Sequence, residues 1–238
     1  MIGRFNKYRR IWNDELEKMG ATPELRKRFS GYYDAWKSSQ APWRSTMVDE
    51  VPWLTYEALD FLNRRVNKSL RVFEFGCGGS TVYFAKNAGE VVTVEHHAEW
   101  FRDMSAAISR KGIHNWQGHL IQEEDGGAGD IADPDAYVSD DENYKGKNFR
   151  KYASFIDQFG NESFDIIIVD GRARPSCTKH ALPKLKKGGW LIIDNADRDY
   201  YFTAFKSILD VQFELISNQK GPAPYCTWFT QTGIWKKK

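Results

Sequence analysis

The sequence predicts an α/β fold built on a doubly wound, seven-stranded, mostly parallel sheet. From residue 70 onward, short apolar runs such as "FDIIIVD" alternate with segments of helical spacing. The last two apolar runs follow each other without a long helix between them. Apolar strands separated by helices are typical of a parallel sheet covered on both faces, whereas strands without a crossover helix can pair antiparallel. We therefore expect an antiparallel strand pair near the C-terminus.

Residues 1–69 predict an N-terminal helical extension that packs on this core. Apolar residues such as Leu16 and Leu25 recur at loosely helical spacing over residues 1–37. Pro42 interrupts the pattern, because the residue before a proline disfavours helix. Pro52 suits a first helical turn, and the apolar stripe that follows it predicts a helix over 53–66.

Residues 70–238 predict one further domain, in which each apolar run is a strand. The expected strands are 70–75, 90–95, 116–122, 164–170, 188–194, 213–217 and 226–237, and the expected helices begin at Ser80, Ala98 and Pro175 or span 151–159 and 200–209. Residues 123–149 interrupt this alternation with an acidic, glycine-rich stretch that has few core residues. Such a long loop in a compact domain is a lid, a binding loop or a disordered segment.

Composition argues against several functional classes. The 34 basic and 32 acidic residues give a net charge of +2, far from the strongly basic balance of a nucleic-acid-binding protein. The apolar runs are much shorter than the roughly 20 residues of a membrane-spanning helix. Three widely spaced cysteines argue against a disulfide framework, and the N-terminus lacks the apolar core of a secretory signal. We expect a soluble, cytoplasmic protein with no membrane partner.

The stretch "FEFGCGGST" predicts a ligand-binding turn at the end of the first strand. Gly76, Gly78 and Gly79 allow a tight turn and close approach of a ligand to the backbone, and Ser80 or Thr81 can cap the next helix. A dinucleotide site would place a third glycine where Thr81 stands. The carboxylate of Glu74 would repel a phosphate but suits a cationic nucleoside without phosphate, such as S-adenosylmethionine.

Glu95 closes the second strand about twenty residues after the turn. An acidic side chain at this place typically accepts hydrogen bonds from ribose hydroxyls. The alternative is a solvated residue at a strand end. The strand–turn–helix–strand unit that sets both positions favours the ribose interpretation.

These motifs resemble those of class I S-adenosylmethionine-dependent methyltransferases, whose fold is Rossmann-like. The motifs are "FEFGCGGST", "VTVEHH", "FDIIIVDG" and "LKKGGWLIIDN", which occur in order over residues 70–195. The resemblance implies that Glu74 and the turn face the amino-acid part of the cofactor, Glu95 the ribose, and His96 the adenine. It places Gln122 or Glu123 near the adenine amine. The expected cofactor residues are Glu74, Gly76, Cys77, Gly78, Ser80, Thr81, Glu95, His96, Gln122 and Glu123.

Asp170, Asp194 and Asn195 end neighbouring strands and are expected at the same edge of the sheet as the cofactor. Three oxygen ligands are the minimum for a Mg²⁺ or Ca²⁺ site that keeps several waters. The pattern is similar to the metal site of catechol-type O-methyltransferases, which implies Mg²⁺ on these three residues. The alternative is that the two aspartates cap helices and hold the adjacent turns.

The general base is an open question, because that family has a lysine shortly after its first aspartate and this sequence has "DGRARPSCTKH". Asp170, Asp194 and His180 are the catalytic candidates, with an ordinary helix-surface role as the alternative for His180. Arg172 and Arg174 are too basic to accept a proton and would suit a carboxylate or phosphate on the substrate.

The stretches "VPWLTYEAL", "VDGRARPSC", "LIIDNADRDYY" and "GPAPYCTWFTQTGIW" also resemble bacterial methyltransferases whose acceptors are presumed to be small molecules or sugars. The predicted function is therefore methyl transfer to a small-molecule acceptor, most simply at a hydroxyl oxygen. Aromatic residues that could form a substrate wall, or be partly buried core, are Trp43, Trp53, Tyr56, Tyr144, Tyr200 and Tyr201.

Two rival functions use the same fold. An RNA or DNA methyltransferase could grip phosphate with "RFNKYRR" and the terminal "KKK", although the acidic loop would repel a phosphate backbone. A steep loss of RNA binding with salt would identify it. A non-catalytic scaffold would keep its binding partners after Asp170→Ala and have no turnover to lose.

Overall fold

A computed structural model describes residues 2–238, with side chains described from Lys7 onward. Met1 lies outside the described part. The basic segment "RFNKYRR" spans residues 4–10, and the side chains of its first three residues also lie outside the described part. The strands are β1 (Arg71–Phe75), β2 (Glu90–Glu95), β3 (Trp116–Leu120), β4 (Glu124–Asp125), β5 (Lys147–Asn148), β6 (Phe164–Val169), β7 (Leu185–Asp194), β8 (Phe213–Ser217), β9 (Lys220–Gly221) and β10 (Thr230–Lys237). The helices are α1 (Ile2–Lys18), α2 (Pro23–Ser30), α3 (Tyr33–Ser39), α4 (Thr46–Asp49), α5 (Tyr56–Asn63), α6 (Gly79–Asn87), α7 (Ala98–Arg110), α8 (Arg150–Ser154), α9 (Arg174–Ala181) and α10 (Lys206–Gln212).

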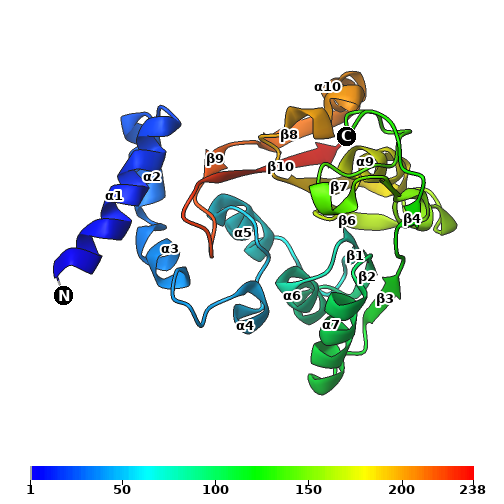
Figure 1. Cartoon of the computed structure of the whole chain (residues 1–238), viewed down its shortest axis with the longest axis horizontal. Helices are drawn as coiled ribbons and strands as arrows, with labels where there is room; N and C mark the ends of the chain where they lie inside the picture. The colour runs from blue at the N-terminus through cyan, green and yellow to red at the C-terminus, as the bar shows by residue number, and fades with distance from the viewer. Residues whose placement is uncertain (1) are drawn as a thin grey trace.

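The central sheet has the strand order β3-β2-β1-β6-β7-β10-β8, with the short β9 paired to β10 (Figure 1). The first five strands of this order pair in parallel, and β10 runs antiparallel to both β7 and β8. The chain order reverses between β1 and β6, so the carboxyl ends of these two strands form the crevice where open α/β sheets bind ligands. The predicted α/β fold, with its parallel sheet and antiparallel C-terminal pair, is confirmed.

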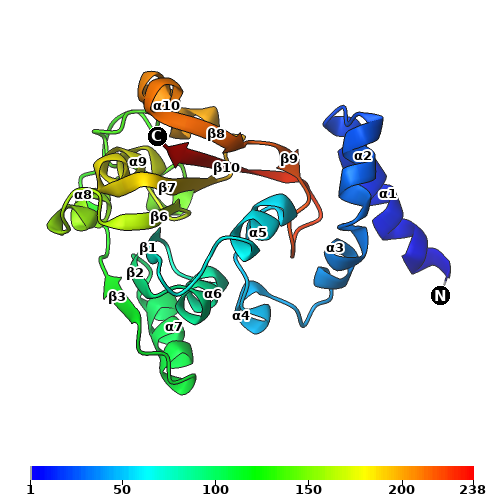
Figure 2. The same cartoon turned by 180° about the vertical axis from the view of Figure 1, so that it is seen from behind.

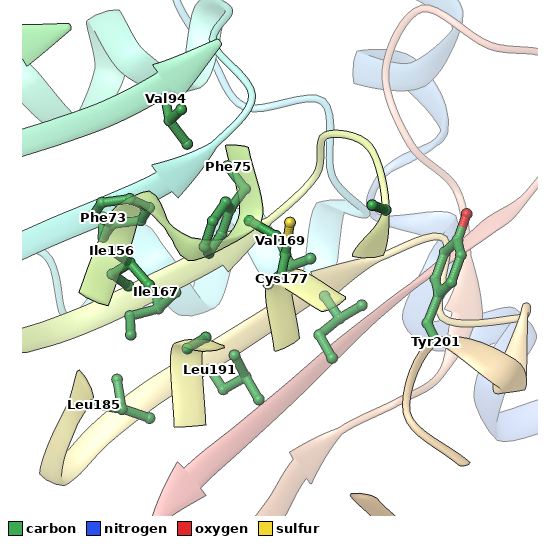
Figure 3. Close-up of a cluster of buried hydrophobic side chains, with 14 of the residues drawn as sticks. Phe73, Phe75, Val94, Ile156, Ile167, Val169, Cys177, Leu185, Leu191 and Tyr201 are labelled. Carbon is green, nitrogen blue, oxygen red and sulfur yellow. The ribbon is translucent and has the colours of Figure 1, made fainter. Parts of the chain in front are cut away.

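Alternating side chains of the strands supply two separate cores. Phe73, Ile167 and Leu191 point to one face, where they pack with α8, α9 and α10. Val72, Ile166 and Ile192 point to the other face and pack with α5, α6 and α7. Figure 3 shows part of the first core, in which Cys177 lies among Val169 and its neighbours. Cys177 is therefore a packing residue of this core.

The helical extension packs on the connection between β9 and β10 (Figures 1 and 2). Trp12, Phe29 and Trp36 form an aromatic core with Phe229. The indole Nε1 of Trp36 donates to the carbonyl of Cys226 at 2.9 Å. The division of the chain into an extension at 1–69 and a domain at 70–238 stays a prediction.

Several boundaries differ from those expected. The predicted strand over 226–237 begins as β10 at Thr230, because the preceding residues bond to the extension instead of to the sheet. The backbone N–H of Phe229 donates to Glu15 Oε2 at 2.8 Å. The predicted helix over 200–209 is instead two 3₁₀ turns, at Asp199–Tyr201 and Thr203–Phe205, followed by α10.

The acidic stretch over 123–149 is folded back on itself. β4 and β5 pair antiparallel at its two ends, and a 3₁₀ turn at Glu142–Tyr144 lies between them. Within residues 2–238, no helix is long and apolar enough to cross a membrane. The cytoplasmic location stays a prediction.

Candidate functional site

The glycine turn after β1 lies against the turn after β6. Gly76 has a φ of 96°, in the region that favours glycine, and a Cβ there would lie 3.2 Å from the carbonyl oxygen of Asp170. The N–H of Gly78 donates to Thr81 Oγ1 at 3.1 Å, which caps the start of α6. Because Gly76 has no side chain, the turn can lie close to the end of β6.

Gly79 brings the extension to the same turn. A Cβ on Gly79 would collide with the carbonyl oxygens of Thr46 and Val51. The segment around α4 thus covers the N-terminus of α6, where backbone N–H groups point outward and favour a negatively charged or polar ligand group. The extension and the glycine turn form one wall.

Glu74 is buried beneath this turn, with 1% of its surface exposed. Its Oε2 accepts a hydrogen bond from Thr93 Oγ1 at 3.1 Å, while Oε1 has no hydrogen-bond partner among the described residues. Burial raises the pKa of Glu74 to about 7, against the opposing effect of Ser80 and Thr81. An unpartnered buried carboxylate oxygen is expected where a ligand completes the site.

Glu95 ties β2 to the glycine turn. Its Oε2 accepts from the N–H of Cys77 at 2.9 Å, and its Oε1 accepts from the N–H groups of His96 and His97 at 2.8 Å. Burial by itself would raise the pKa of Glu95, but the hydrogen bonds and the His96 side chain hold it at about 2. Glu95 is thus a permanent carboxylate at neutral pH.

His96 is buried beside a tyrosine of the acidic stretch. Its ring centre lies 4.9 Å from that of Tyr144, and neither ring nitrogen has an aligned hydrogen-bond partner among the described residues. Its Nδ1 is 2.8 Å from Glu95 Oε1 without hydrogen-bond alignment. Gln122 is exposed and Glu123 is half-buried, and these two residues, like Glu74, Glu95 and His96, line neither of the cavities described next.

Two cavities lie at the carboxyl edge of the sheet. The smaller, of about 110 Å³, is lined by Thr46, Trp53, Gly76, Cys77, Gly78, Gly79, Ser80, Trp100 and Asp170. The larger, of about 350 Å³, is lined by Trp53, Asp170, Arg174, Asp194, Asn195, Arg198, Cys226, Trp228 and Thr230. Trp53 and Asp170 belong to both linings, so the two cavities adjoin at these residues.

Trp100 narrows the smaller cavity. Its indole Nε1 donates to the carbonyl oxygen of Cys77 at 2.6 Å, which lays the side chain across the glycine turn. The cavity is small beside the 300–1,000 Å³ typical of ligand pockets. In this conformation the smaller cavity has room for only part of a nucleoside.

A buried arginine joins the strand ends at the floor of the larger cavity. Arg174 Nη2 donates to Asp170 Oδ1 at 3.0 Å, and Arg174 Nη1 donates to the backbone carbonyl of Asp194. Thr232 Oγ1 donates to Asp194 Oδ1 at 2.9 Å. Burial, and to a lesser extent the nearby Asp170 carboxylate, raises the pKa of Asp194 well above its usual range.

Residues 73–196, which are 124 of the 238 residues, match the sequence profile of a family described as a methyltransferase domain. The chain belongs to this methyltransferase family. The predicted enzyme class, an S-adenosylmethionine-dependent methyltransferase, is thereby confirmed.

Solved structures show that this methyltransferase shares its fold with other members of that class. An O-methyltransferase from Bacillus cereus in complex with SAH has 14% identity and a TM-score of 0.56, covering 97% of this chain and all of the other. A candidate O-methyltransferase from Klebsiella pneumoniae has 14% identity and a TM-score of 0.53, covering 96% of both chains. A candidate methyltransferase from Streptococcus mutans in complex with SAH has 16% identity and a TM-score of 0.51, covering 76% and 96%. No curated protein matches the sequence.

The methyltransferase does not present the predicted Mg²⁺ ligands as a metal site. Arg174 takes one Asp170 oxygen, Thr232 takes one Asp194 oxygen, and Asn195 Nδ2 donates to Thr230 Oγ1 at 3.1 Å. Within the described residues, no group of three or more His, Cys, Asp or Glu side chains is placed to hold a metal ion. The residues present do not fit Mg²⁺, since the Arg174 guanidinium already binds the Asp170 carboxylate and the backbone carbonyl of Asp194.

The other predicted catalytic residue of the methyltransferase lies away from both cavities. His180 is in the last turn of α9, where its Nδ1 lies 2.7 Å from Asp157 Oδ2 and its Nε2 lies 3.1 Å from the Tyr137 hydroxyl. Both ring nitrogens are therefore engaged. This arrangement favours the helix-surface alternative.

Sequence reasoning missed Trp100, Arg198 and Trp228, which line the two cavities. Trp228 was missed because its segment was assigned to a strand. Trp100 was missed because no sequence pattern showed which way its helix packs. Of the six proposed wall residues, Trp53 lines both cavities, while Tyr201 is buried and Tyr56 stacks on Tyr32. The arginines also differ from expectation, because Arg172 pairs with Asp141 at 2.9 Å and Arg174 with Asp170.

Proposed function

We propose that this methyltransferase binds S-adenosylmethionine over the ends of β1 and β2 and methylates a hydroxyl oxygen of a small molecule in the larger cavity. The observation that carries the proposal is that the two cavities adjoin at Trp53 and Asp170. A donor on the glycine turn and an acceptor in the larger cavity then meet at one place. A cavity of about 350 Å³ suits a small molecule.

The cofactor residues divide by the part of the nucleoside that they face. Glu74 and the backbone of Gly76, Cys77 and Gly78 hold the amino-acid part, with Ser80 and Thr81 at the start of α6. Glu95 accepts from the ribose through its remaining lone pairs, since Oε2 takes a single backbone bond. The buried ring of His96, whose Nδ1 lies near Glu95 and whose Nε2 has no hydrogen-bond partner among the described residues, faces the adenine. Gln122 and Glu123 stay a proposal from family resemblance for the adenine amine.

Methyl transfer depends more on placing the acceptor oxygen than on activating the methyl group, because a methyl group on a sulfonium is already reactive. The acceptor oxygen attacks the methyl carbon, the carbon–sulfur bond breaks, and its electron pair returns to sulfur. The hydroxyl proton must leave, and in-line placement supplies much of the rate. Asp170 lies at the junction of the cavities, and its Oδ2 has no described hydrogen-bond partner, so we assign it as the proton acceptor.

Methyl transfer converts S-adenosylmethionine into S-adenosylhomocysteine (SAH). Calorimetry with SAH therefore tests the cofactor site without knowledge of the acceptor. We expect wild-type protein to bind SAH and Glu95→Gln to bind at least tenfold more weakly, because the neutral amide accepts ribose hydrogen bonds less well. Glu99→Gln is the matched control, since Glu99 is an exposed acidic residue in the next helix and lines neither cavity. No binding to folded wild-type protein would contradict the proposed function.

A further inference from the structure

Arg174 is the first residue of α9, and the chain reaches it through Ala173 in the left-handed conformation (φ 47°, ψ 47°). This turn aims the arginine back at the strand ends. The residue is 8% exposed, and its guanidinium carbon lies 5.1 Å from the centre of the Tyr201 ring. Ring and ion pair together hold the cation in place.

The guanidinium connects the ends of β6 and β7. Its Nε donates to the carbonyl of Gly171 at 3.1 Å, its Nη1 to the carbonyl of Asp194, and its Nη2 to the carboxylate of Asp170. These acceptors are carbonyl and carboxylate oxygens, the same kind of ligand that a hard divalent cation would take. The Arg174 guanidinium therefore already places a positive charge between the carboxyl ends of β6 and β7.

Part of the guanidinium remains available to a ligand. Arginine has five N–H donors, and the bonds to described residues use three of them. Arg174 lines the larger cavity, as does its partner Asp170. Arg198, the other cation of that cavity, is instead turned to Asp140 at 2.7 Å.

We propose that Arg174 performs the work of the divalent cation found in metal-dependent O-methyltransferases, so that this enzyme methylates its acceptor without a metal. The inference rests on the proposed function. A free N–H of Arg174 holds the acceptor oxygen and stabilises its negative charge as the O–H proton passes to Asp170 Oδ2. The oxygen then bonds to the methyl carbon, and sulfur leaves as the neutral thioether.

The first test is a metal-binding titration that needs no acceptor. Mn²⁺, followed by electron paramagnetic resonance, is titrated into the wild-type SAH complex and into the Arg174→Ala SAH complex. We expect no stoichiometric Mn²⁺ site in the wild type at submillimolar concentration, and a site in Arg174→Ala, where the two strand ends lose their cation. A stoichiometric Mn²⁺ site in the wild-type complex would overturn the inference.

The second test follows SAH formation with a panel of hydroxylated acceptors in the presence of EDTA. We expect the wild-type rate to change less than twofold on adding EDTA, and Arg174→Ala to fall about 100-fold, the usual loss of one donor to a developing oxyanion. Added guanidinium ion should restore at least tenfold of that loss, which a structural role would not allow. The rate of Arg174→Lys should lie between those of the wild type and Arg174→Ala, because lysine keeps the positive charge but lacks the planar guanidinium group with its paired N–H donors.

The control is Lys179→Ala, a half-exposed cation on the same helix that pairs with Asp135 outside the cavities. A wild-type enzyme inactivated by EDTA and restored by Mg²⁺ would refute the inference, as would full activity of Arg174→Ala. Failure of the proposed function is distinct from these results, because it would appear as absence of SAH binding. Should Arg174→Ala not fold, the wild-type Mn²⁺ titration and Arg174→Lys decide the matter.

Discussion

Glu74 and Glu95 are buried glutamates on neighbouring strands, yet their pKa values shift in opposite directions. Burial raises that of Glu74 to about 7, whereas three backbone N–H groups and His96 overcome the same penalty at Glu95 and lower its value to about 2. The sign differs because backbone N–H groups and the His96 side chain stabilise the charged form of Glu95, whereas the groups that stabilise charged Glu74 are hydroxyls. Glu95 is therefore fixed as an anion, while Glu74 changes its charge near neutral pH.

Binding of SAH should strengthen about tenfold between pH 6 and pH 8. The carboxylate form of Glu74 attracts the ammonium group of SAH, and with a pKa of about 7 its population rises over this interval. Glu74→Gln should bind weakly and lose this pH dependence. Calorimetry at pH 6, 7 and 8 measures the effect, and an unchanged slope in the variant would exclude Glu74 as its source.

The same shift predicts a stability change of defined sign. The folded-state pKa of Glu74 lies above its model value of 4.5, so the folded protein holds this proton more tightly than the unfolded chain. Its contribution is complete below pH 4.5 and is lost as pH rises through 7. Glu74→Gln should accordingly raise the melting temperature of the ligand-free protein more at pH 8 than at pH 5.

Some residues of the site were predictable from sequence because their places follow from the backbone pattern. Gly76 must be glycine to have a positive φ beside the Asp170 carbonyl, and the acidic Glu95 follows at the end of the next strand. Arg174 was recognised as a cation, but its partner was not. No sequence pattern shows that Ala173 adopts the left-handed conformation, which turns Arg174 toward the strand ends.

At the scale of elements, the acidic stretch 123–149 is fastened to the segments that follow β6 and β7. Asp140 Oδ2 accepts from Arg198 Nη1 and from the Tyr200 hydroxyl, both at 2.7 Å. Asp141 pairs with Arg172 at 2.9 Å. The stretch therefore bridges two of the strand ends that bear the proposed site.

Asp140→Ala should release this stretch. Loss of one carboxylate removes an ion pair and two tyrosine hydrogen bonds, so backbone amides of residues 124–148 should exchange hydrogen at least tenfold faster. Hydrogen exchange followed by mass spectrometry measures this. Glu142→Ala is the control, as an exposed acidic residue two positions away. Equal exchange in both variants would mean that Asp140 does not hold the stretch.

Element boundaries were least predictable where distant segments compete for a backbone. The strand expected from residue 226 begins at Thr230, because Trp36 and Glu15 bond to Cys226 and Phe229. The sheet itself was predictable, since alternating apolar runs and helices admit few arrangements. The partners of single N–H and C=O groups depend on contacts across 190 and 214 residues, which local patterns do not report.

At the scale of the whole molecule, a buried carboxylate joins the extension to the segment that precedes β10. Glu15→Ala would leave the Phe229 N–H buried without an acceptor, which costs about 1–3 kcal/mol. We expect urea denaturation to show this loss of unfolding free energy. Glu17→Ala, an exposed acidic residue on the same helix, should change it by less than about 0.5 kcal/mol. Equal stabilities would show that another group replaces Glu15.

The pairing of Glu15 with Phe229 also bears on how the protein is made. Translation delivers Phe229 more than 200 residues after Glu15, a delay of roughly 10–40 s at ribosomal speeds. Throughout that interval the indoles of Trp12 and Trp36 lack the ring that covers them in the finished protein. The nascent helices would then be natural clients for chaperones, and slowing the ribosome before codon 229 should lengthen that dependence.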